Sequence, residues 1–235
     1  MNHFESMALV SRRLKPLGVP YAFLGGSIVP LLVDDPNLHQ IRPTLDVDII
    51  VHVITQYEYA AFEQRLRHEG FVNDTSEGAP LCRYLLEGHK VDIMPVSSSA
   101  IGLSSRWFPQ ALSSAEPRYV GINESVPVIR PSYFLATKLE AFKDRGNKDY
   151  QASHDLEDLL AVIDGCERIV DQIAQGPDDL REYLAHEFSE LLDQRTFREA
   201  LPGHLPGGLG DQARLPLLLA RLKSISELKP LSSKA

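Results

Sequence analysis

The sequence predicts an α+β fold, with a mixed β-sheet domain and flanking helices over residues 1–130 and a helical domain over residues 131–235. Short apolar runs that end at glycine, proline or charged residues recur up to about residue 130 and are typical of strands. Segments of helical periodicity separate these runs and continue alone from Pro131 onward. Strands that come first, with helices after them, indicate an α+β chain.

The first half contains the expected strands. In chain order we expect a helix over residues 1–18, a strand over 19–26, a helix over 27–33, a strand over 45–53, a helix over 55–71, and two strands over 81–88 and 90–96 joined by a tight turn. In the first helix, Phe4, Met7, Ala8 and Leu14 face inward and Val10 lies at the edge of that face. Ser27 is a candidate N-cap for the second helix.

The second half is predicted to be almost entirely helical. Residues 97–120 are rich in serine and proline and receive no assignment, and residues 126–131 form a last short strand. Helices follow from Pro131, with breaks near residues 146–147, 165 and 176–177, a loop over 201–212 and a final amphipathic helix over 213–225.

Charge, cysteine content and hydropathy limit the classes of function. A net charge of −8 argues against a generally basic surface that coats nucleic acid, although a local basic groove stays possible. The two cysteines match no metal or redox spacing, so we expect two buried free thiols. No apolar run approaches the roughly 18 residues of a membrane span, and the N-terminus lacks a signal-peptide layout. These features favour a cytoplasmic protein with no membrane partner.

The stretch "TLDVDIIV" places two aspartates in a strand that otherwise reads as buried. Asp46 and Asp48 are two residues apart, so both carboxylates leave the same face of the strand. Two adjacent negative charges are costly to bury unless a positive group lies between them. Hard carboxylate oxygens suit Mg²⁺, so the pair is a candidate metal site.

Two further segments extend this candidate site. Gly25, Gly26 and Ser27 lie at a strand-to-helix junction, where a phosphate can approach the backbone, although the same residues also occur in plain turns. Asp92, in "KVDIM", is a third strand aspartate and a candidate third metal ligand. The alternative is that Asp92 forms an ion pair with Lys90 or Arg83.

The order of these motifs resembles the nucleotidyltransferase superfamily that includes DNA polymerase β. That family has a glycine-serine turn, then an acidic-x-acidic strand, then a third acidic residue on a neighbouring strand. The resemblance implies a Mg²⁺- or Mn²⁺-dependent enzyme that uses a nucleoside triphosphate, with Asp46, Asp48 and Asp92 as metal ligands and catalytic residues. Asp92 would act as the third ligand or would deprotonate the acceptor hydroxyl.

The helical half contains charges in unusual places. On a helix over "PSYFLATKLEAFKDRG", Lys138 and Arg145 fall within the apolar arc and need anionic partners. The alternative is that both side chains snorkel at the edge of the arc. On the next helix Asp155 lies beside the apolar face, which makes it the better partner for Lys138, while Asp158 lies further round. Asp155 could instead support the helix N-terminus, where Ser153 is a candidate cap.

The pair "TKLEAFKDRG" and "HDLEDLL" resembles the AbiEii/AbiGii-type nucleotidyltransferases and the related mycobacterial MenT toxins, over roughly residues 20 to 165. Position by position, the resemblance implies a phosphate-binding turn at Gly26 and Ser27, a nucleotide-binding and catalytic Lys138 and a catalytic Asp155. Thr44 matches a threonine that precedes the acidic pair and would share its strand face. His154 stands where the family often has arginine, which leaves its role open.

These observations predict transfer of a nucleoside monophosphate from an NTP to an acceptor hydroxyl. The resemblance implies an RNA acceptor, with the tRNA 3′ end first, and the role of a toxin that a cognate antitoxin silences. Two alternatives stay open: transfer to a small acceptor of the aminoglycoside type, and a catalytically inactive nucleotide-binding or protein-interaction module. The predicted nucleotide-binding residues are Gly25, Gly26, Ser27, Thr44, Lys138 and Arg145.

Overall fold

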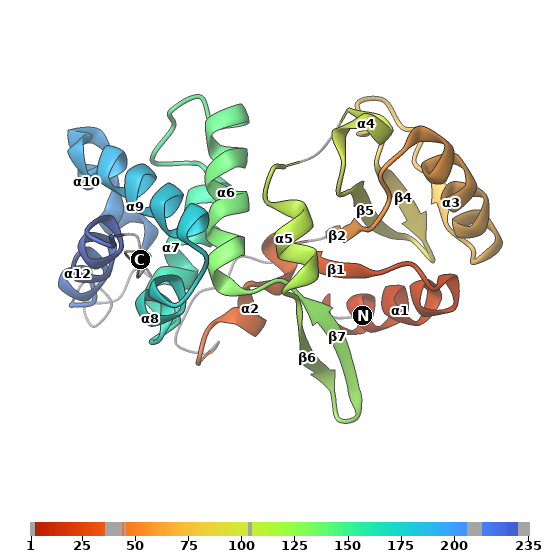
Figure 1. The fold of residues 1–235 in the computed structure, drawn as a ribbon, viewed down its shortest axis with the longest axis horizontal. Coiled ribbons are helices and arrows are strands. Elements are labelled where there is room, and N and C mark those ends of the chain that lie inside the picture. Colours follow the sequence, from red (N-terminus) through yellow and green to blue (C-terminus); the bar gives the residue numbers. More distant parts are fainter. Residues whose placement is uncertain (1–2, 36–43, 45, 103–104, 206–212, 230–235) are drawn as a thin grey trace, which may run out of the picture. The chain divides into compact units, whose positions relative to one another are not determined.

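The computed structural model describes residues 3–35, 44, 46–102, 105–205 and 213–229, and the chain divides into two compact units. Unit 1 comprises residues 1–28 and 43–130, and unit 2 comprises residues 29–42 and 131–235. Unit 1 contains a mixed β-sheet with helices, whereas the described part of unit 2 is helical (Figure 1). The predicted α+β class is therefore confirmed.

The sheet of unit 1 has seven strands in the order β3-β4-β5-β2-β1-β7-β6. Their bounds are β1 (Tyr21–Leu24), β2 (Asp46–Val51), β3 (Val72–Asn73), β4 (Arg83–Leu86), β5 (His89–Pro95), β6 (Glu116–Gly121) and β7 (Glu124–Val128). The central strand β2 pairs in parallel with β5 and antiparallel with β1. Its apolar residues Val47, Ile49 and Ile50 are buried, which explains why its sequence reads as a core strand.

Helices flank this sheet. They are α1 (His3–Leu14), α3 (Gln56–His68), α4 (Ser98–Ile101) and α5 (Phe108–Ser113), with a 3₁₀ turn η1 (Lys15–Leu17) after α1. Helix α1 packs against β2, β6 and β7 and fully buries Val10, which the sequence had placed at the edge of the apolar face. Helix α3 begins with a capping box: the Thr55 hydroxyl accepts from the Glu58 amide at 3.2 Å, and the Glu58 carboxylate accepts from the Thr55 amide at 3.0 Å.

Two local expectations for unit 1 were incomplete. The unassigned stretch before residue 120 contains β6, which forms an antiparallel hairpin with β7. The residues of β6 alternate in exposure and form no continuous apolar run, so its own sequence gives little strand signal. The strand forms because β7 pairs with it. The helix expected over residues 27–33 is only α2 (Val29–Leu32), preceded by the 3₁₀ turn η2 (Gly26–Ile28), and Ser27 does not cap it.

Unit 2 is a cluster of packed helices. They are α2, α6 (Pro131–Arg145), α7 (His154–Gly165), α8 (Ile169–Ala174), α9 (Asp178–Asp193), α10 (Arg195–Ala200) and α12 (Leu215–Ser226), with a 3₁₀ turn η4 (Leu201–His204). The predicted breaks are confirmed, because α6 ends at Arg145, α7 at Gly165 and α8 just before Gly176. The expected loop over 201–212 begins with η4, and residues 206–212 lie outside the described residues. Helix α7 packs against α6 and α12 around buried leucines.

Two simpler expectations can be compared directly with the structure. In the described ranges, no helix combines the length and the apolar character needed to cross a membrane. Cys82 and Cys166 are both buried and form no disulfide, as the sequence predicted. Burial raises the pKa of the Cys82 thiol to about 11, so this thiol is not poised to act as a nucleophile at neutral pH.

Candidate functional site

The three strand aspartates lie on one face of the sheet of unit 1. The register of the parallel pair places Asp48 of β2 directly opposite Asp92 of β5. Asp46 precedes Asp48 by two residues and leaves the same face. On the other side of β5, Arg83 of β4 lies opposite Asp92. Three carboxylates and one guanidinium therefore meet across β2, β5 and β4.

Arg83 is the positive group among these aspartates. Its Nε donates to Oδ1 of Asp92 at 2.7 Å, and its Nη2 donates to Oδ2 of Asp92 at 2.7 Å. The same Nη2 donates to Oδ2 of Asp46 at 3.2 Å. The hydrogen bonds to Asp92 are the largest cause of a raised Arg83 pKa, and the guanidinium is permanently charged. Of the two alternative partners expected for Asp92, Arg83 is the one that forms the ion pair. Lys90 lies opposite Asp46 in the register of β2 and β5.

The carboxylates fit a metal ion as a pair rather than as a triad. Among the described residues, no group of three or more His, Cys, Asp or Glu side chains is placed to hold a metal. Both oxygens of Asp92 bind Arg83, whereas the Asp46 side chain is 42% exposed and shares its strand face with Asp48. Mg²⁺ commonly uses one or two carboxylates and completes its shell with water and substrate phosphates. Asp46 and Asp48 match that donor set.

The glycine-serine turn lies directly against Asp48. Gly25 has φ +74°, and a Cβ built on it would lie 1.9 Å from Oδ2 of Asp48. Glycine is therefore required there both by the backbone conformation and by the approach of the carboxylate. Ser27, two residues on, is 1% exposed, and its Oγ has no hydrogen-bond partner in the part of the chain that the structure describes. A buried hydroxyl without a protein partner is unusual in a folded protein.

Thr44 lies two residues before Asp46, the first residue of β2. Thr44 is half-buried, and Leu45 between the two lies outside the described residues. The expected place of Thr44 beside the aspartate pair therefore stays a prediction.

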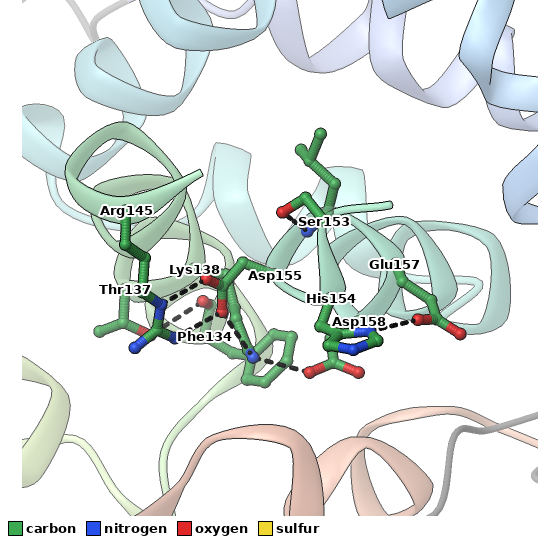
Figure 2. Close-up of polar contacts among 10 residues, drawn as sticks. Phe134, Thr137, Lys138, Arg145, Ser153, His154, Asp155, Glu157 and Asp158 are labelled. Atoms are coloured by element: carbon green, nitrogen blue, oxygen red, sulfur yellow. Dashed lines mark hydrogen bonds and ion pairs between the residues drawn. The ribbon is translucent and has the colours of Figure 1, made fainter. Parts of the chain in front are cut away.

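A second charged cluster lies in unit 2, between α6 and α7 (Figure 2). Nζ of Lys138 donates to Oδ1 of Asp155 at 3.0 Å and to Oδ2 of Asp158 at 2.6 Å. Arg145 donates two hydrogen bonds of 2.9 Å to Asp155, from Nε to Oδ2 and from Nη2 to Oδ1. The Lys138 side chain is only 10% exposed, so its ammonium is held inside the unit and does not snorkel. Arg145, at 68% exposed, lies at the edge of the cluster.

The electrostatics of this cluster favour the charged forms of Lys138 and Asp155. Burial by itself would lower the pKa of Lys138, but the carboxylates of Asp158 and Asp155 outweigh it and the pKa is raised. Burial would likewise raise the pKa of Asp155, but the bonds from Arg145 and the charge of Lys138 lower it. An aspartate held ionised in this way is a weak proton acceptor at neutral pH. Its arrangement suits the positioning of two cations better than acid–base chemistry.

Sequence reasoning gave too little weight to Asp158 and Arg83. Asp158 follows Asp155 by three residues on α7, so the two carboxylates lie on neighbouring turns and both reach Lys138. That spacing was the available signal. Arg83 was considered only as a partner of Asp92, and its additional bond to Asp46 depends on the register of three strands.

The remaining predicted positions in α7 have local roles. Ser153 is the N-cap, with its hydroxyl accepting from the Leu156 amide at 3.4 Å, as predicted. Asp155 therefore follows the cap rather than replacing it. His154 is exposed, and its Nδ1 lies 3.2 Å from Oε2 of Glu157 (Figure 2). The structure places His154 outside the Lys138 cluster.

Comparison with known proteins gives only distant likenesses. No protein-family model matches the chain, and no curated protein matches it. Among solved structures, an antigenic nucleotidyltransferase-like protein from Paracoccidioides brasiliensis is 21% identical, with a TM-score of 0.48 over 85% of this chain and 93% of that one. The antibiotic-resistance factor ANT(2″)-Ia is 13% identical, with a TM-score of 0.48 over 81% and 94%. JHP933 from Helicobacter pylori is 12% identical, with a TM-score of 0.47 over 96% and 92%.

Proposed function

We propose that this protein is a Mg²⁺-dependent nucleotidyltransferase that moves a nucleoside monophosphate from an NTP to an acceptor hydroxyl. One observation carries the proposal. Asp46 and Asp48 share a face of β2, and the Gly25–Ser27 turn meets Asp48 so closely that only glycine fits at position 25. A carboxylate pair beside a glycine-rich turn joins a metal-binding group to a phosphate-binding backbone.

The residues of unit 1 divide the chemistry between them. Asp46 and Asp48 would hold Mg²⁺, which activates the attacking hydroxyl and offsets charge on the leaving pyrophosphate. The backbone of the turn at Gly25 and Gly26 would bind the triphosphate, and the hydroxyl of Ser27 would donate to one of its oxygens. The acceptor hydroxyl would lose its proton to solvent water, and its oxygen would bond to the α-phosphorus as the bond from that phosphorus to the bridging oxygen breaks. The electron pair leaves with pyrophosphate.

The residues of unit 2 supply positive charge in this proposal. Of the two proposed nucleotide-binding cations, Arg145 is 68% exposed and would bind the phosphates and stabilise the leaving group. Lys138 is 10% exposed and would reach the phosphates by exchanging its bonds to Asp155 and Asp158. Asp155 contacts both cations and holds their side chains in place, while Asp158 also binds Lys138. Asp155 is thus a positioning residue in the proposed reaction, and the lowered pKa of its carboxyl agrees with that role.

The acceptor follows from the sequence resemblance rather than from the geometry. The proposed acceptor is RNA, with the tRNA 3′ end first, and the proposed cellular role is that of a toxin silenced by an antitoxin. The net charge of −8 favours a different acceptor, a small cationic compound of the aminoglycoside type. Mn²⁺ is the proposed replacement for Mg²⁺, because it accepts the same oxygen ligands.

The test is transfer of label from each α-³²P-labelled NTP in Mg²⁺ or Mn²⁺, first to total RNA and purified tRNA and then to a panel of aminoglycosides. We expect label on one class of acceptor with wild-type protein and none with Asp46→Asn or Asp48→Asn. Asp74→Asn is the matched control, since Asp74 is a surface aspartate of the same unit bonded to Ser76. Equal transfer by Asp48→Asn and wild type would show that Asp48 does not hold the metal and would contradict the proposed metal site. Nucleotide binding without transfer to any acceptor would favour the inactive binding module.

A further inference from the structure

Three carboxylates and the guanidinium of Arg83 lie together on one face of the sheet of unit 1. Asp46, Asp48 and Asp92 lie on the same face of two adjacent strands, and Arg83 is the cation bonded to two of them. The Arg83 side chain is 18% exposed and that of Asp92 is 12% exposed, so their ion pair is largely shielded from water. A shielded bidentate pair between arginine and carboxylate is strong and geometrically specific.

This pair changes what Asp92 can do. Both of its oxygens accept hydrogen bonds of 2.7 Å from Arg83, one from Nε and one from Nη2. An oxygen that accepts a charged hydrogen bond at this distance is a poor ligand for a metal until the guanidinium moves. Asp46 accepts only the longer bond of 3.2 Å from Arg83, and its side chain is 42% exposed. Arg83 therefore engages both oxygens of Asp92 but only one oxygen of the more exposed Asp46.

We infer that Arg83 is a positioning residue that withholds Asp92 from the metal, so that the site binds a divalent cation together with nucleotide phosphates rather than alone. This inference rests on the proposed function. With two carboxylates a Mg²⁺ or Mn²⁺ ion has most of its coordination positions filled by water, and binding is weak. Phosphate oxygens of the nucleotide then complete the coordination shell, so the metal binds the protein together with the nucleotide.

Loss of the Arg83 guanidinium should change how the protein binds a divalent cation. Arg83→Met removes the positive charge and keeps an unbranched side chain of similar length. Asp92 then becomes a third ligand, and one positive charge near the ion is lost. We expect Mn²⁺ to bind this variant at least about tenfold more tightly than wild type without nucleotide. The factor by which nucleotide increases the affinity for Mn²⁺ should decrease by about the same amount.

The experiment measures Mn²⁺ directly and does not depend on catalysis. Electron paramagnetic resonance gives free Mn²⁺ in titrations of the full chain, with and without a non-hydrolysable NTP analogue. Water-proton relaxation gives the number of waters that stay on the bound ion. Arg118→Met is the matched control: Arg118 lies on β6 of the same unit, pairs with Glu116 at 3.4 Å, and its loss changes net charge equally. Thermal melts confirm that each variant is folded.

We expect tighter Mn²⁺ binding and one fewer bound water in Arg83→Met, and no change in Arg118→Met. Wild-type affinity and hydration in Arg83→Met would overturn the inference while leaving the proposed metal pair intact, provided that Mn²⁺ with nucleotide still depends on Asp48. Equal binding by wild type and Asp48→Asn in the presence of nucleotide would overturn the proposed function, and the inference with it.

Discussion

Removal of the Lys138 ammonium tests whether the charged cluster of unit 2 is a buried, structural arrangement. Lys138→Met keeps an unbranched side chain but takes away the cation that binds Asp155 and Asp158. The side chains of these aspartates are 7% and 3% exposed, so their charges cannot be fully rehydrated. Loss of one member of a buried ion pair costs about 3–5 kcal/mol. We expect a decrease of that size in the free energy of unfolding.

Arg145→Met is the natural comparison because Arg145 binds the same carboxylate. Its side chain is 68% exposed, so water and salt already screen much of the interaction. An exposed pair contributes about 0–1 kcal/mol, and we expect a loss within that range. The difference between the two variants isolates the effect of burial on one shared aspartate.

The assay is equilibrium unfolding in urea, followed by two signals. Far-UV circular dichroism weights the helices, which make up the described part of unit 2, whereas fluorescence of Trp107, the single tryptophan, reports unit 1. The dichroism transition should move in Lys138→Met. Lys138→Met combined with Asp158→Asn should recover about half of the lost stability, because the second change removes a buried charge. A loss below about 1 kcal/mol in Lys138→Met would refute the reasoning.

Two more predictions concern acid stability and the glycine-serine turn. The pKa of Asp155 is lowered in the folded protein, so its contribution to stability is complete above the unfolded pKa and is lost as the pH falls below about 4. Asp155→Asn should therefore flatten the acid limb of a stability–pH curve measured by urea unfolding; an unchanged limb would contradict the assignment. Ser27→Ala removes a buried hydroxyl that has no described partner, so the free energy of unfolding should stay level or rise by about 1 kcal/mol. The same change should weaken NTP binding about tenfold by calorimetry, and unaltered affinity would exclude Ser27 from the phosphate site.

Those parts of the candidate site that depend on local geometry could be predicted from the sequence. Strand periodicity alone places Asp46 and Asp48 on one face, because side chains alternate along any extended chain. Helical periodicity places Lys138 inside the apolar arc of α6, and the structure buries it there. The cap at Ser153 and the breaks at the helix ends also follow from a few adjacent residues.

The elements that sequence reasoning missed depend on partners elsewhere in the chain. Strand β6 has no continuous apolar run of its own and forms because β7 supplies its hydrogen bonds. Ser27 was expected to cap a helix, but the chain continues into a 3₁₀ turn and leaves its hydroxyl buried. In both places, packing and pairing outweigh the local signal.

The sequence by itself therefore determined the α+β class, the order of its main elements, the shared face of the aspartate pair and the inward position of Lys138. The sequence also proposed the pairs of Lys138 with Asp155 and of Arg83 with Asp92, and only the tertiary structure decided which further charges meet. Arg83 reaches Asp92 and Asp46 because the register of β4, β5 and β2 aligns them, and Lys138 reaches Asp158 because α6 packs on α7. Periodicity fixes the direction of a side chain along its own element. The identity of its partner depends on register and packing between elements distant in the chain, which local patterns do not encode.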